Sequence, residues 1–144
     1  MLLNLNSRHE AESLLAKDPL IQQGLATYEI LSIEIRKGSV CDPFFPYEMV
    51  TYEFVRYSPT NQIASYKTNS DFDMKRLHEQ YLQNLINTDE VIMEGTFGAN
   101  DGGILIYRSG SQAIDIERDP AITNGYLVAE TRKIWLNKGS FCDY

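Results

Sequence analysis

The chain has 144 residues, 43% of them hydrophobic and 11% aromatic, which is enough to bury the core of one domain or of a domain and a fraction. Its 20 acidic against 13 basic residues give a net charge of −7, which argues against a nucleic-acid-binding surface and against attachment to an anionic membrane. The sequence has no apolar run long enough to cross a bilayer and no signal-peptide pattern at its start, so we expect a cytoplasmic protein.

Residues 1–40 predict a β-α-β unit. A short apolar strand is expected at residues 2–5, and a helix capped by Ser7 follows it. The β-forming residues 25–35 predict a second strand. A turn-rich linker with two prolines, residues 41–46, separates this unit from the rest of the chain.

Residues 47–144 predict a complete β-α-β-β-α-β domain. The expected elements are strands at 47–57, 90–98, 104–108 and 126–138, a helix from about residue 70 to 85, a turn at 99–103 and a short or broken helix at 109–120. The longer helix has the clearest amphipathic stripe in the chain, formed by Met74, Leu77, His78, Tyr81, Leu82 and Leu85. This order of elements is that of the ferredoxin-like split β-α-β fold within the α+β class.

One phrase occurs twice in the sequence. "KGSVCD" begins at residue 37 and "KGSFCD" begins at residue 138. From Asp18 and from Asp119, two 25-residue segments align without a gap and agree at 11 positions, where composition alone predicts about one or two agreements. The spacing is about the length of a small domain, so we interpret residues 1–40 as a half-repeat, a copy of the rear half of the complete domain. The missing front half was either lost or lies upstream.

Cys41 and Cys142 are the only cysteines, and they occupy the same position in the two copies. We interpret them as two free thiols of a reducing cytosol. A metal site would need a cluster of Cys and His ligands, which the sequence lacks. It also lacks a glycine-rich phosphate loop and a nucleophile elbow, so neither a metal nor an organic cofactor is predicted.

His78 is the residue that points most directly to chemistry. It lies within an apolar helical stripe, where a buried imidazole needs partners for both ring nitrogens. A core histidine satisfied by a backbone carbonyl is the interpretation that spacing alone favours, and a general acid or base is the functional one. Asp119 is the candidate carboxylate to orient the imidazole, although Asp119-Pro120 also predicts a helix cap, as Asp18 does in the half-repeat.

The complete domain resembles the YciI-like (YCII-related) family over residues 47–138. The matching segments are "RLHEQYL", "MEGTF", "GGILIYR", "RDPAITNG" and a last strand ending in "IWL". The resemblance implies a ferredoxin-like fold that pairs into a dimeric α+β barrel, so a homodimer or higher homo-oligomer is expected. It implies a cleft with a histidine and an aspartate, roles that fall to His78 and Asp119. Arg76, Tyr81 and Gly95 are the candidate ligand-binding residues.

The function implied by this resemblance is cofactor-free chemistry on a small molecule. Most family members have no established activity, and a few are implicated in eliminating halide from ring-derived lactones or related acids. The expected function is proton transfer by a His-Asp pair on a small organic acid or lactone, as in a lyase or hydrolase. The alternative is a non-catalytic small-ligand-binding or assembly module. The chain departs from the family in its extra half-repeat and in Thr96, where a proline usually follows the glycine.

Overall fold

The computed structural model describes residues 5, 7–60, 69–98 and 102–142. The chain divides into two compact units, Met1–Ser32 and Ile33–Tyr144. Residues 33–40, the end of the predicted half-repeat, therefore belong to the second unit together with residues 47–144. The predicted strand at 2–5 lies outside the described residues except for Leu5, as do most of the loop before residue 69 and residues 99–101 of the predicted turn.

The first unit contains two short helices, α1 (Arg8–Leu15) and α2 (Pro19–Gln22). Ser7 caps α1 as predicted, because its hydroxyl accepts a hydrogen bond from the backbone N–H of Glu10 at 3.2 Å. Asp18 caps α2 in the same way, accepting from the N–H of Leu20 at 2.8 Å. Residues 25–33 form no strand, so this part of the predicted 25–35 strand is wrong.

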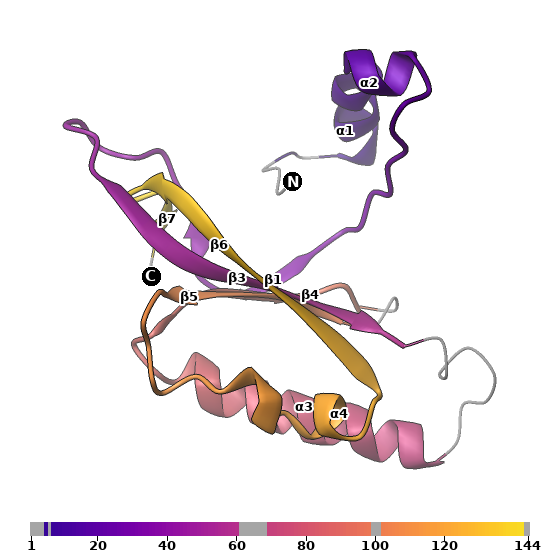
Figure 1. Ribbon diagram of the computed structural model, residues 1–144, viewed down its shortest axis with the longest axis vertical. Helices are drawn as coiled ribbons and strands as arrows, with labels where there is room; N and C mark the ends of the chain where they lie inside the picture. The colour runs from indigo at the N-terminus through magenta and orange to yellow at the C-terminus, as the bar shows by residue number, and fades with distance from the viewer. Residues whose placement is uncertain (1–4, 6, 61–68, 99–101, 143–144) are drawn as a thin grey trace. The chain divides into compact units, whose positions relative to one another are not determined.

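The second unit is an α+β structure built on a five-stranded antiparallel sheet in the order β1-β4-β5-β3-β6. The elements are β1 (Glu34–Lys37), β3 (Met49–Pro59), α3 (Asn69–Ile86), β4 (Val91–Thr96), β5 (Gly103–Arg108), the 3-10 turn η2 (Ile116–Arg118), α4 (Pro120–Thr123) and β6 (Leu127–Asn137). From β3 to β6 they follow one another in the predicted order. Figure 1 shows α3 and α4 together on one side of the sheet.

The core lies between this side of the sheet and the two helices. Its buried apolar residues are Val55 and Tyr57 of β3, Leu82 and Leu85 of α3, Val91, Leu105, Tyr107, Ile114, Ile116, Ala121 and Leu127. Burying one large side chain of this kind contributes about 1.5–3 kcal/mol. The amphipathic stripe of α3 faces this core, as predicted, because the buried side chains of the helix include His78, Leu82 and Leu85.

A short two-stranded ribbon joins the two copies of the repeated phrase. It consists of β2 (Ser39–Val40) and β7 (Phe141–Cys142), which pair antiparallel. The ribbon brings the Cα atoms of Cys41 and Cys142 to 5.9 Å, within the usual range for a disulfide, and the two sulfurs are bonded. The interpretation of these cysteines as free thiols is therefore wrong. The sequence alone did not indicate that the two copies pair with each other.

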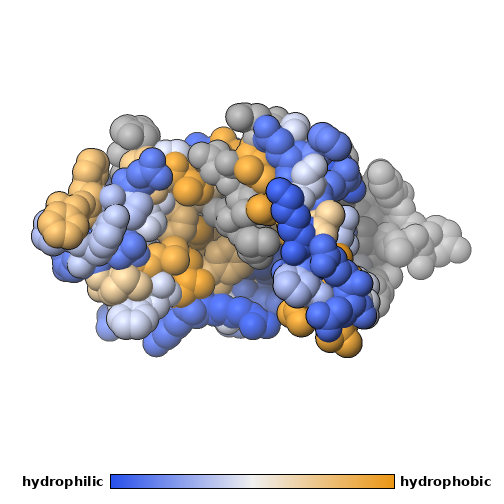
Figure 2. Space-filling model, turned by 90° about the horizontal axis from the view of Figure 1, so that it is seen from above, coloured by the Kyte–Doolittle hydropathy of each residue, from blue (hydrophilic) through white to orange (hydrophobic). Residues whose placement is uncertain are grey.

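Several large apolar side chains remain at the surface. Figure 2 shows hydrophobic residues reaching the surface in patches among hydrophilic ones. The exposed set includes the aromatic residues Phe44, Phe45, Tyr47 and Trp135. Among the described residues, no helix combines the length and the apolarity needed to cross a membrane.

Candidate functional site

The structure places the two predicted catalytic residues in direct contact. His78 lies on the buried side of α3, and Asp119 immediately precedes α4. His78 Nδ1 and Asp119 Oδ2 are 2.6 Å apart, and the two residues are only 5% and 0% exposed. An imidazole and a carboxylate at this distance inside a protein form a strong, charge-assisted hydrogen bond.

The second oxygen of Asp119 also accepts a hydrogen bond. Oδ1 accepts from the backbone N–H of Ala121 at 2.9 Å and so caps α4, as predicted. An ionised carboxylate can only accept, so the bond to His78 requires a proton on Nδ1. Nε2 then carries the lone pair and is the atom that can take up a proton. An imidazole oriented by a carboxylate in this way is the usual form of a histidine base.

Tyr57 forms the wall behind the imidazole. Its ring meets the ring of His78 edge to face, with centroids 5.0 Å apart. Its hydroxyl is buried and, among the described residues, has no hydrogen-bond partner. Burial, followed by the nearby charge of Asp119, raises the pKa of Tyr57 well above its usual value, so the hydroxyl stays protonated.

Tyr57→Phe is expected to leave the free energy of unfolding unchanged or to raise it by up to about 1 kcal/mol, because the variant no longer buries an unpaired hydroxyl. Urea unfolding measures this. Tyr81→Phe is the matched control, since the Tyr81 hydroxyl donates to the carbonyl of Asp115 at 2.6 Å and its loss should cost about 1 kcal/mol. A larger loss for Tyr57→Phe than for Tyr81→Phe would show that the Tyr57 hydroxyl is paired.

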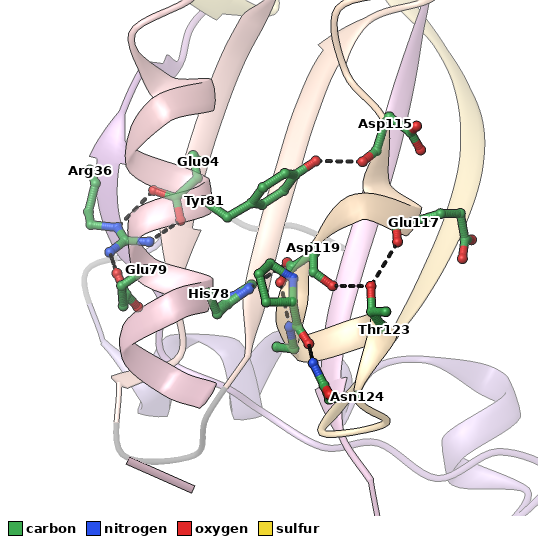
Figure 3. A network of polar contacts seen from close by, with 12 residues as sticks. Arg36, His78, Glu79, Tyr81, Glu94, Asp115, Glu117, Asp119, Thr123 and Asn124 are labelled. Atoms are coloured by element: carbon green, nitrogen blue, oxygen red, sulfur yellow. Dashed lines mark hydrogen bonds and ion pairs between the residues drawn. The ribbon is translucent and has the colours of Figure 1, made fainter. Parts of the chain in front are cut away.

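A second polar cluster lies on the other side of α3 from Asp119 (Figure 3). The Arg36 guanidinium donates to both carboxylate oxygens of Glu94, at 2.8 Å through Nε and at 2.5 Å through Nη2. It also pairs with Glu79, the residue after His78. Glu94 is 1% exposed, so its charge depends on this partner. The hydrogen bond to Glu94, more than any other interaction, raises the pKa of Arg36 above its already high value.

His78 and this cluster line the same small cleft. Its wall includes Lys75, His78 and Glu79 of α3, Arg36 of β1, and Glu94 and Thr96 of β4. The cavity volume is about 20 Å³, room for one or two water molecules. A ligand must therefore be small or must extend out through the open side of the cleft.

Thr96 lies at one end of this cleft, where its side chain links two backbone segments. Its hydroxyl accepts from the N–H of Gly98 at 3.1 Å and donates to the carbonyl of Gly102 at 3.3 Å. A proline could form neither bond. The threonine therefore ties together the two ends of the β4–β5 connection.

The three predicted ligand-binding residues do not line the cleft. Arg76 is exposed and pairs with Asp73 at 3.5 Å. Tyr81 packs against the core, and burial is the main cause that raises its pKa to about 12. Gly95 lies buried in β4, where a Cβ atom would stand 2.8 Å from the backbone oxygen of Glu34. The close approach at Gly95 therefore comes from the neighbouring strand β1.

The charged cleft residues that sequence reasoning missed are Arg36, Lys75, Glu79 and Glu94. Glu94 gave a usable signal, because it is the one charged residue in the apolar strand "VIMEGT" and a buried carboxylate requires a cation. The sequence could not identify that cation, since Arg36 is 58 positions away. Its position in the half-repeat gave no reason to connect it with the complete domain.

No protein-family model, no curated protein and no solved structure matches this chain. A proposal about its function therefore depends on the geometry of the site. Among the described residues, no group of three His, Cys, Asp or Glu side chains could hold a metal ion. The geometry offers an imidazole held by a buried carboxylate, at the wall of a cleft that also contains the ion-paired Glu94.

Proposed function

We propose that residues 47–144 form a ferredoxin-like domain of the YciI-like type, which binds a small organic molecule in the cleft and transfers a proton through His78. The strand order β4-β5-β3-β6, with both helices on one side, supports the fold. The observation that carries the function is the 2.6 Å contact between His78 and the buried Asp119 beside the cleft. The reaction requires neither a metal nor an organic cofactor.

In the proposed reaction, His78 Nε2 accepts a proton from a carbon next to a carbonyl group. The electron pair of the broken C–H bond forms a double bond, and a leaving group departs from the adjacent carbon with its own bonding pair. Asp119 stabilises the imidazolium that forms, and it does so strongly because the pair is shielded from water. Loss of the proton from Nε2 to solvent restores the neutral imidazole.

The charges around the cleft favour a neutral ligand. Arg36 and Lys75 contribute two positive charges, and Glu79 and Glu94 contribute two negative ones. The described lining therefore has no excess positive charge to hold a carboxylate. Hydrogen bonding to a carbonyl or ring oxygen does not require one, so a lactone fits this lining better than a free acid.

The alternative function is non-catalytic binding of a small ligand, or assembly. The small cavity and the low exposure of His78 favour it, because a substrate must reach Nε2. In that case His78 and Asp119 serve mainly to hold α3 against α4.

Turnover by His78→Ala separates the two functions. We expect the variant to lose activity on a lactone substrate by about 10²- to 10⁴-fold, the usual contribution of a general base. NMR-detected turnover of a panel of plain and halogenated lactones is the assay, and His9→Ala, an exposed histidine on α1, is the matched control. Binding without turnover in the unmodified protein, or full activity in His78→Ala, contradicts the catalytic role.

A further inference from the structure

The two copies of the repeated phrase pair with each other symmetrically. In the β2–β7 ribbon, Val40 lies opposite Phe141, its own counterpart in the repeat. The N–H of Cys41 donates to the carbonyl of Ser140 at 2.9 Å, and the disulfide joins the counterpart cysteines Cys41 and Cys142. This is the relation that one segment has to itself across the twofold axis of a symmetric dimer. Here both segments belong to one chain.

The half-repeat also fills an edge of the main sheet. Strand β1, the counterpart of the end of β6, pairs antiparallel with the outer edge of β4. Two glycines permit this close approach. A Cβ atom on Gly95 would stand 2.8 Å from the oxygen of Glu34, and one on Gly38, where φ is +72°, would stand 2.1 Å from the oxygen of Ile92.

Lys37 fastens the same segment to α3. Its Nζ donates to the carbonyls of Ile86 and Thr88, each at 2.8 Å, at the end of the helix that carries His78. Its counterpart, Lys138, instead pairs with Glu48 at the surface. The half-repeat copy therefore makes contacts that the other copy does not make.

Arg36 is the most specific of these contacts. Its counterpart in the complete domain is Asn137, which could not form the two-pronged bond to Glu94. Three of the five guanidinium N–H groups of Arg36 donate to Glu94 and Glu79. The side chain lines the cleft and is 27% exposed. Among the described residues its two other N–H groups have no acceptor, so they can donate to a ligand oxygen.

We propose that residues 34–42 are a built-in replacement for the strand of a second subunit and that they deliver Arg36 to the cleft. There Arg36 holds Glu94 in place and binds a neutral carbonyl or ring oxygen of the ligand. Only this ligand class rests on the proposed function; the delivery of Arg36 by the same chain stands on the pairing and the contacts.

Probe binding to the full chain tests the role of Arg36. The ring signals of His78 are followed by NMR while γ-butyrolactone is added, with the ring-opened 4-hydroxybutyrate as the charged comparison. Arg36→Met should weaken lactone binding at least 10-fold and shift the His78 signals of the free protein, whereas Arg132→Met, an exposed arginine on β6, should do neither. Unchanged binding and unchanged His78 signals in Arg36→Met overturn the proposal. Should Arg36→Met fold poorly, Arg36→Met/Glu94→Gln, which removes both charges, replaces it.

A mixing experiment tests whether Arg36 acts within its own chain. Arg36→Met chains are unfolded, mixed with Glu94→Gln chains and refolded together. If each chain supplies its own Arg36, the mixture shows only the His78 signals of the two variants. Reappearance of the wild-type signals would show exchange between subunits and overturn the proposal. The mixing experiment needs no ligand. A wild-type protein that binds neither probe would therefore count against the proposed function, and not against the delivery of Arg36 by its own chain.

Discussion

Reduction of the Cys41–Cys142 disulfide is expected to lower the free energy of unfolding by about 3–5 kcal/mol, because the bond closes a loop of about 100 residues and so limits the freedom of the unfolded chain. Guanidinium unfolding with and without dithiothreitol measures this difference. The folded state should survive, since β1 keeps its ladder to β4.

A Cys41→Ser/Cys142→Ser variant is the control for this experiment. It should match the reduced protein in stability and should not respond to the reductant. Thiol titration of the purified, unfolded protein counts the free thiols and so tests the pairing directly. Two reactive thiols, with no effect of reductant on stability, would show that the cysteines are not paired.

Asp119→Ala is expected to cost about 2–4 kcal/mol of folding stability, because it removes both a helix cap and the acceptor of a buried hydrogen bond. About 1 kcal/mol of this is the lost cap of α4. The remainder comes from leaving the His78 Nδ1 proton buried without an acceptor. Urea or guanidinium unfolding measures the total.

The chain supplies its own control for Asp119. Asp18 caps α2 with the same geometry, and it has a proline after it as Asp119 does. Asp18 lies near the surface, so Asp18→Ala should cost at most about 1 kcal/mol, the value of a cap alone. Equal costs for Asp18→Ala and Asp119→Ala would mean that the contact with His78 contributes nothing to stability.

The sequence predicted the elements whose signals are local. The stripe of α3 was visible because apolar residues at helical spacing must face a core. The caps at Ser7, Asp18 and Asp119 were visible because their side chains satisfy nearby backbone N–H groups. The His78–Asp119 contact could be suspected, since a polar side chain on a buried helix face requires a partner.

Residues 25–33 of the predicted 25–35 strand show what local signals cannot provide. Its counterpart, residues 126–134, contributes to β6, which pairs with β3 along its length. Residues 1–40 contain no segment that aligns with β3, and a strand without a neighbour gains little from its β-forming residues. Leu20 also lacks the burial of its counterpart: it is 54% exposed, whereas Ala121 is fully buried.

Arg36 was missed, and the cysteines were misinterpreted, for a related reason. Their roles depend on contacts between the half-repeat and the complete domain. The spacing of residues within either of them does not predict such contacts. The repeat itself showed that Cys41 and Cys142 are counterparts, but not that counterparts pair. Such pairing is a property of the antiparallel β2–β7 ribbon.

The His78–Asp119 pair is tested most directly by the tautomer of His78, read from the ring nitrogens by NMR after His9→Ala has removed the other histidine. We expect a neutral imidazole with its proton on Nδ1, held by Asp119, and a changed ring spectrum in Asp119→Asn. A proton on Nε2, or a His78 spectrum indifferent to Asp119→Asn, would contradict this expectation. The pair could then not present Nε2 as a base to the cleft.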